Sequence, residues 1–68
     1  NGIKRLRLEK SMPQEELAMK LNVLKQAITK WENGDANPRA DKLPLLAQAL
    51  GCSIDALFQD DLEQARGV

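Results

Sequence analysis

The chain has 68 residues, with ten basic and ten acidic side chains and no histidine, so its formal net charge at pH 7 is zero. A chain of this size forms one domain and buries about 60% of its unfolded surface, so its core has to be small. Zero net charge argues against a generic nucleic-acid or membrane-surface binder. The charges are segregated, however: residues 1–30 carry seven bases and three acids, a net charge of +4, and residues 31–68 carry three bases and seven acids, a net charge of −4.

The sequence lacks the residues that several classes of protein require. No apolar run reaches the roughly 20 residues that cross a bilayer and no signal-peptide pattern is present, so we expect a cytoplasmic protein without a membrane partner. Cys52 is the one cysteine and histidine is absent, so neither a disulfide nor a zinc-type site is predicted. Without histidine or tyrosine, acid–base and nucleophilic constellations are hard to assemble. We therefore expect no enzymatic activity, no metal and no cofactor.

Apolar spacing predicts an all-α fold of five short helices, because no alternating run of β-branched residues is present. The first helix covers about residues 3–10. The second starts at Pro13, which suits the first helical position, and ends at Asn22, which tolerates a left-handed conformation. One face of this second helix has the i, i+3, i+4, i+7 spacing of Gln14, Leu17, Ala18 and Leu21.

The third predicted helix, from residue 24 to about residue 33, has an apolar and a polar side and is closed by Gly34. Its apolar side consists of Leu24, Ala27, Ile28 and Trp31. At about 100° per residue, five other side chains fall within an arc of about 140° on the opposite side. This arc, which is free to face a ligand, contains Lys25, Gln26, Thr29, Lys30 and Asn33.

A fourth helix is predicted to end at Gly51, and Pro44 determines where it begins. Proline deep inside a helix removes a hydrogen bond and clashes with the preceding turn, but it is harmless in the first turn. We therefore expect Asp41 to be the N-cap and regular helix to begin near Lys42. A continuous helix over residues 39–50 would contradict this expectation.

Ser53 is predicted to cap a fifth helix, because its hydroxyl can accept a hydrogen bond from a free backbone N–H of the first turn. The inner face of this helix is expected to consist of Ile54, Leu57 and Phe58. The tail, about residues 60–68, is expected to fray or to add a short helical turn. No repeat or internal linker divides the chain, so residues 1–68 are interpreted as one domain.

The second and third helices, about residues 13–33, have the spacing of a helix-turn-helix, in which the second helix can lie in a DNA major groove. Asn22 and Val23 form the short turn, and Ala18 is small where the two helices approach each other. Ile28 and Trp31 anchor the second helix of the motif to the core.

An ordered set of short motifs extends this pattern over about residues 3–58: Ile3-Lys4-Arg5-Leu6-Arg7, Gln14-Glu15-Glu16-Leu17-Ala18, Trp31-Glu32-Asn33-Gly34, Asn37-Pro38, Leu46-Ala47-Gln48-Ala49-Leu50-Gly51 and Ser53-Ile54-Asp55-Ala56-Leu57-Phe58. In these motifs the chain resembles the phage-repressor and Cro-type helix-turn-helix family of XRE-like transcriptional regulators. The resemblance implies a compact five-helix, lambda-repressor-like DNA-binding domain.

Carried over by this resemblance, Lys25, Gln26 and Thr29 are the principal base-reading residues, and Lys30 either reads a base or contacts phosphate. Their chemistry suits base edges, because Gln pairs with adenine, Lys donates to guanine, and Thr offers a hydroxyl and a methyl group. Most polar helix faces only contact water, so an isolated helix of this kind would not indicate DNA binding. The surrounding motif favours the DNA interpretation.

Four further residues are candidates for phosphate contacts. Gln14 begins the second helix, where free N–H groups favour an anion, and the resemblance implies that it also braces the recognition helix. Asn33 is either a phosphate contact or a turn-stabilising residue. Lys4 and Arg5 are expected to strengthen binding to all DNA sequences alike.

The resemblance assigns a structural role to Arg7 and Glu32, as a partly buried ion pair between the first and third helices. The sequence departs from the family at two helix N-caps, where Pro13 and Leu24 stand in place of the usual serine or threonine. A lost cap costs about 1 kcal/mol.

These features predict a sequence-specific DNA-binding transcriptional regulator, a repressor that binds a palindromic operator on double-stranded DNA as a homodimer. Two recognition helices would enter successive major grooves about 34 Å apart, and the resemblance implies dimer contacts from the fifth helix and tail, around residues 58–62. The basic half of the chain would face the phosphates and the acidic half would point away. The alternative is a protein-interaction module of the same fold, such as an antitoxin or a coactivator-like adaptor, which binds a protein partner through the acidic half.

Overall fold

A computed structural model of the chain describes residues 2–58. It confirms the predicted all-helical fold, since this part of the chain contains five α-helices, a short 3₁₀ turn and no strand. The elements are α1 (Ile3–Glu9), α2 (Gln14–Leu21), α3 (Lys25–Asn33), the 3₁₀ turn η1 (Ala40–Lys42), α4 (Leu43–Leu50) and α5 (Ile54–Leu57). None of the helices in this region is long and apolar enough to cross a bilayer.

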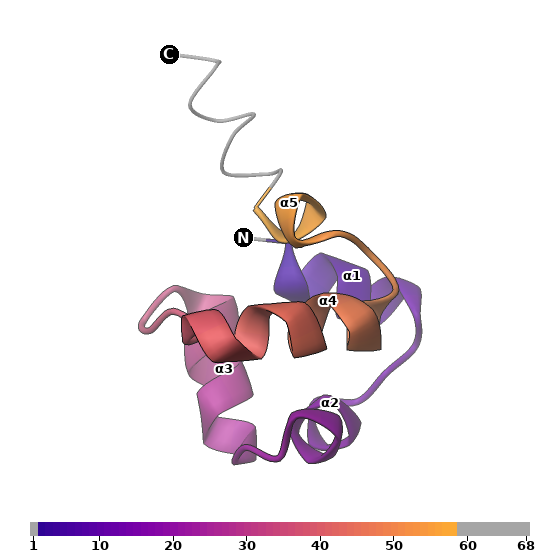
Figure 1. The fold of residues 1–68 in the computed structure, drawn as a ribbon. Helices are drawn as coiled ribbons and strands as arrows, with labels where there is room; N and C mark the ends of the chain where they lie inside the picture. The colour runs from indigo at the N-terminus through magenta and orange to yellow at the C-terminus, as the bar shows by residue number, and fades with distance from the viewer. Residues whose placement is uncertain (1, 59–68) are drawn as a thin grey trace.

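The helices are arranged so that α2 and α5 lie at opposite ends of the molecule (Figure 1). Helix α2 packs against α3 and α4, and α1 packs against the same two helices. The start of the chain lies beside α5, where the Gly2 N–H donates a hydrogen bond of 2.7 Å to the Leu57 carbonyl. This arrangement leaves the α2–α3 turn at the end of the molecule away from α5, and α3 runs along one side of the molecule (Figure 1).

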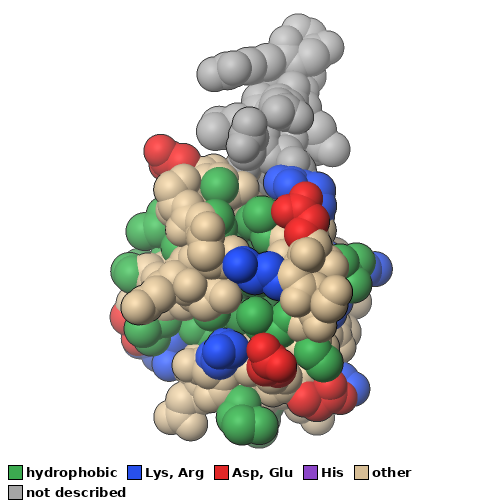
Figure 2. Space-filling view, turned by 90° about the vertical axis from the view of Figure 1, so that its right-hand side faces the viewer, with side chains coloured by type: hydrophobic (Ala, Val, Ile, Leu, Met, Phe, Trp, Pro, Cys, Tyr) green, Lys and Arg blue, Asp and Glu red, His purple; other side chains and the backbone are tan. Residues whose placement is uncertain are grey.

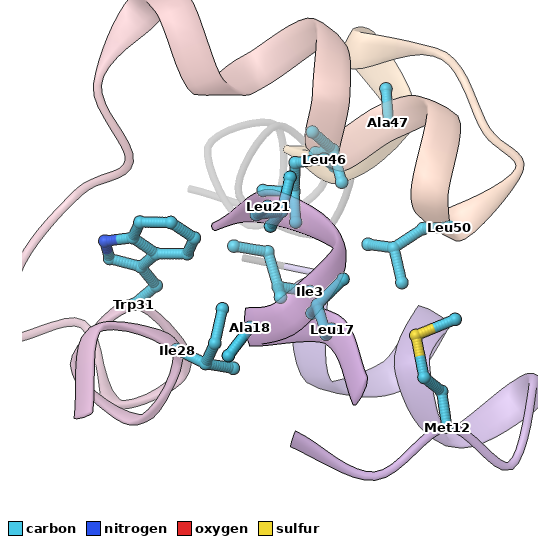
Figure 3. Close-up of a cluster of buried hydrophobic side chains, with 11 residues drawn as sticks. Ile3, Met12, Leu17, Ala18, Leu21, Ile28, Trp31, Leu46, Ala47 and Leu50 are labelled. Atoms are coloured by element: carbon cyan, nitrogen blue, oxygen red, sulfur yellow. The ribbon is translucent and has the colours of Figure 1, made fainter. Parts of the chain in front are cut away.

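The core is formed by apolar side chains from all five α-helices and from the segment between α1 and α2. Six of them are essentially inaccessible to solvent: Ile3, Leu17, Leu21, Ile28, Leu46 and Leu57. The Trp31 indole of α3 lies beside Ile28 and points in toward the core (Figure 3), with 6% of its surface exposed. The apolar anchors predicted for α3 therefore hold this helix from its inner side, so its outer side is free.

Three helices end at the residues that the sequence predicted. Asn22, Gly34 and Gly51 follow α2, α3 and α4, and each has left-handed backbone angles, with φ of 56°, 81° and 67°. Ser53 caps α5, because its hydroxyl accepts a hydrogen bond of 3.2 Å from the Ala56 N–H. Pro13 and Leu24 are the N-caps of α2 and α3, and neither makes a side-chain capping bond.

The start of α4 corrects one detail of the prediction. The helix begins at Leu43, one residue after the expected position, and its N-cap is Lys42, not Asp41. The preceding 3₁₀ turn includes Asp41, so this residue cannot occupy the extended conformation of a capping residue. Pro44 lies in the first turn of α4, as predicted, where its missing N–H removes no helical hydrogen bond.

Two residues predicted to lie on inner faces are exposed instead. Leu24 is 74% exposed and Ile54 is 40% exposed. Leu24 precedes α3 in an extended conformation, so the helical period does not fix its direction, and Ile54 is the first residue of a four-residue helix. Phe58 is half-buried against the core, and the rest of the predicted dimer segment and the tail lie outside the described residues.

Candidate nucleic-acid interface

Helices α2 and α3 and the turn between them form the helix-turn-helix. The turn closes through a hydrogen bond of 3.0 Å from the Val23 N–H to the Ala18 carbonyl, and the small Ala18 side chain is buried between the helices. A contact that the sequence did not predict stabilises the same end of α2, because Lys42 Nζ donates to the Leu21 carbonyl over 3.1 Å. A cation at a helix C-terminus is favourable, so Lys42 joins the α4 region to the end of α2.

The four predicted base-reading residues lie together on the outer side of α3. They line one hollow of about 390 Å³, whose lining consists of Lys25, Gln26, Thr29 and Lys30. Lys25, Gln26 and Lys30 are exposed and Thr29 is half-buried. Because Ile28 and Trp31 anchor the other side, α3 presents a continuous polar surface that offers both donors and acceptors.

Gln14 joins the start of α2 to this surface. Its Nε2 donates to Glu32 Oε1 over 2.9 Å, and its Oε1 lies 3.4 Å from the Thr29 hydroxyl. The Thr29 hydroxyl also lies 3.3 Å from the Lys25 carbonyl, so its single hydrogen is shared between two acceptors within the protein. Gln14 thus braces α3 at two points, and the Thr29 hydroxyl is engaged within the protein.

Arg7 and Glu32 form an ion pair between α1 and α3. Arg7 Nε lies 2.6 Å from Glu32 Oε2, and a second guanidinium nitrogen lies 3.2 Å from Oε1. The third nitrogen donates to the Met12 carbonyl over 2.8 Å. The side chains are 9% and 3% exposed, and Glu32 also holds Gln14, so one buried carboxylate connects α1, α2 and α3.

A second ion pair, between Glu15 and Lys25, lies at the edge of the polar surface and was not predicted. Lys25 Nζ lies 2.9 Å from Glu15 Oε1, and both side chains are more than half exposed. The hydrogen bond from the Lys25 ammonium holds the pKa of the Glu15 carboxyl below its ordinary value. The two residues are ten positions apart on different helices, so no local sequence signal indicates the pair.

The remaining predicted phosphate contacts are not part of this hollow. Lys4 and Arg5 line a hollow of about 640 Å³ beside Glu9 and Glu32, together with a further α1 side chain, and Arg5 pairs with Glu9 at 3.3 Å. Asn33 is exposed at the C-terminal end of α3. The structure therefore groups the four base-reading candidates but places Lys4 and Arg5 in another hollow.

Several basic side chains of residues 1–30 are engaged within the protein. Arg7 is buried with Glu32 and Lys25 is paired with Glu15, while the Lys10 side chain lies against Gly51 at the C-terminal end of α4. On the side of the molecule away from α3, acidic and basic side chains are interspersed (Figure 2). Charge segregation along the sequence is thus only partly preserved in space.

Comparison with known proteins agrees with this geometry. The helix-turn-helix family matches residues 3–57. The chain is 34% identical over 59 residues to the helix-turn-helix-type transcriptional activator BcrR of Enterococcus faecalis, a match that covers 87% of this chain and 29% of that protein. It is 50% identical over 50 residues to the 26 kDa repressor protein of Escherichia phage HK022, covering 71% of this chain and 21% of that protein.

The chain therefore spans less than a third of the length of either relative. The family match nevertheless includes every helix that the structure describes. The resemblance stated from the sequence motifs is confirmed by this match and by both relatives. The chain belongs to the helix-turn-helix family of DNA-binding transcriptional regulators, of the phage-repressor and Cro type.

Proposed function

We propose that this chain is a sequence-specific DNA-binding unit that places α3 in the major groove and represses transcription from the site it binds. The observation that supports this function best is that Lys25, Gln26, Thr29 and Lys30 line one hollow on α3. These side chains match the donors and acceptors of base edges. The buried anchors and the Gln14 braces on the inner side favour a fixed pose of α3.

Within this proposal the four residues have unequal roles. Gln26 and Lys30 are exposed and read bases directly, and Lys25 reads a base from its position beside Glu15. Thr29 contributes its methyl group, because its hydroxyl is engaged with Gln14 and the helix backbone. Phosphates are contacted by Gln14, Asn33, Lys4 and Arg5.

We further propose that two copies bind a palindromic operator, with recognition helices about 34 Å apart. The repressor role is supported by the similarity to a phage protein named as a repressor, although another relative is named as an activator. Residues 1–68 would serve as one DNA-binding domain, acting in the cytoplasm where bacterial and phage DNA lies. Both relatives are more than three times as long as their match to this chain, so a larger parent protein is compatible with this assignment.

In vitro selection from random duplexes, followed by mobility-shift titration of the selected site, tests the proposal. Gln26→Ala should weaken binding to the selected site by about 1 to 3 kcal/mol and relax specificity at one base pair. Gln48→Ala is the matched control, because Gln48 is an exposed glutamine on α4 and should leave specific binding unchanged. Lys4→Ala should weaken binding to selected and random duplexes by the same factor.

The proposal fails if no selected sequence binds more tightly than random duplex. It also fails if Gln26→Ala and Gln48→Ala have equal effects on the selected site. Either result would leave the fold intact and would favour a protein-interaction module.

A further inference from the structure

An exposed leucine stands at the N-terminal end of the proposed recognition helix. Leu24 occupies the N-cap position of α3, where Ser, Thr, Asp or Asn is usual, and it is 74% exposed. Its extended backbone, with φ −77° and ψ 150°, directs the side chain away from the core instead of along the buried side of α3. Single exposed leucines are common on protein surfaces, so exposure alone assigns no role to this residue.

Leu24 lies in an apolar hollow that adjoins the base-reading candidates. It lines a hollow of about 330 Å³ whose other walls are Gln26, Ala27, Lys30, Trp31 and Ala36. Four of these six residues are apolar, and the two polar ones, Gln26 and Lys30, also line the hollow of the base-reading candidates. An apolar hollow and a polar hollow thus lie on the two sides of the same pair of side chains.

We propose that Leu24 is a specificity-determining residue that packs against the 5-methyl group of a thymine, in the base pair read by Gln26 or in its neighbour. This inference rests on the proposed function. In the major groove, the thymine methyl group is the one apolar feature among the donors and acceptors of the four bases. An apolar wall next to a glutamine therefore fits an A·T pair, with the glutamine on adenine and the leucine on thymine.

A protein partner is the other occupant to consider for this surface. The position of the hollow favours DNA, because a partner seated on Leu24 would also cover Gln26 and Lys30, the residues proposed to read bases. The two occupants would exclude each other, and under the proposed function DNA has to contact Gln26 and Lys30 beside Leu24.

The test replaces each thymine of the selected half-site, one at a time, with deoxyuridine, which lacks only the 5-methyl group. The 68-residue chain should bind one of these uracil duplexes about fourfold more weakly than the thymine duplex, the factor that corresponds to one buried methyl group. Leu24→Ala should bind the thymine and uracil duplexes equally at that position. Any general effect of uracil on duplex structure cancels in this comparison.

Two further variants separate recognition from folding. Leu45→Ala removes another exposed apolar side chain, 45% exposed on α4 and outside the hollows that Leu24 lines, and should keep the fourfold discrimination. Leu24→Ser supplies a hydroxyl at the N-cap and should raise the midpoint of thermal unfolding while it abolishes the discrimination.

The inference is overturned if Leu24→Ala or Leu24→Ser still discriminates thymine from uracil at the sensitive position, or if no thymine is sensitive in the unmodified chain. Both results are obtained with DNA that the chain has selected, so they leave the proposed function in place. Failure to select any sequence would instead refute the proposed function itself.

Discussion

Replacing Arg7 with methionine removes three hydrogen bonds, two to the Glu32 carboxylate and one to the Met12 carbonyl. The methionine fills part of the same space, but Glu32 keeps its negative charge with 3% of its side chain exposed and Gln14 as its remaining partner on this side. Breaking one half of a buried pair costs about 3 to 5 kcal/mol. A domain of 68 residues has a total stability of about 3 to 10 kcal/mol, so the variant should be marginally folded.

Urea unfolding followed by tryptophan fluorescence measures this loss, because Trp31 is the one tryptophan of the chain and its indole is buried in the folded state. The double variant Arg7→Met with Glu32→Met should recover most of the stability, since it removes the uncompensated charge together with its partner. The double variant also keeps the test measurable if the single variant does not fold. A loss below about 1 kcal/mol for Arg7→Met would show that the pair behaves as an exposed one, and a double variant no more stable than Arg7→Met would refute the argument from buried charge.

Three other predictions concern contacts between helices. Glu15→Gln should release Lys25 to bind a phosphate in non-specific complexes. The plot of log binding constant against log salt concentration should then steepen by up to about 0.9. The neighbouring Glu16→Gln makes the same change in net charge and should alter this slope less; equal slopes for the two variants would show that the ion pair does not restrain Lys25. The Lys25 ammonium lowers the pKa of the Glu15 carboxyl, so the ion pair persists at neutral pH and is lost as the pH falls through that lowered pKa. An NMR titration of the Glu15 carboxyl should therefore show a higher midpoint in Lys25→Met than in the unmodified chain. Lys42→Met should lower the free energy of unfolding by about 1 kcal/mol, because it leaves the Leu21 carbonyl at the end of α2 without this hydrogen bond. Lys20→Met is the control: Lys20 is exposed in the last turn of the same helix, and the variant should change the free energy of unfolding by less than about 0.5 kcal/mol.

The parts of the fold that could be predicted are those that the sequence determines locally. Asn22, Gly34 and Gly51 end helices because their own backbone preferences permit left-handed angles. Ser53 caps α5 through a hydrogen bond to a residue three positions away. The inner face of α2 and the anchors Ile28 and Trp31 follow from helical periodicity alone.

The errors arise where helical periodicity does not apply or where contacts are distant in sequence. Leu24 was assigned to the inner face by counting helical steps through a residue that is not helical. The contact from Lys42 to Leu21 spans 21 positions, and the Glu15–Lys25 pair joins two helices. Such contacts depend on how the helices dock, which a single sequence does not encode in any local spacing.

The meeting of three helices at Glu32 has a consequence for engineering this chain. The Glu32 carboxylate binds Arg7 and Gln14, whereas Gln26 and Lys30 are exposed and do not take part in these contacts. Positions 26 and 30 can therefore be randomised in a library while the angle of α3 stays constant. Thr29 should be left unchanged, because its hydroxyl contacts Gln14. In a library that varies position 29, a change in DNA preference could not be separated from a loss of this contact between α2 and α3.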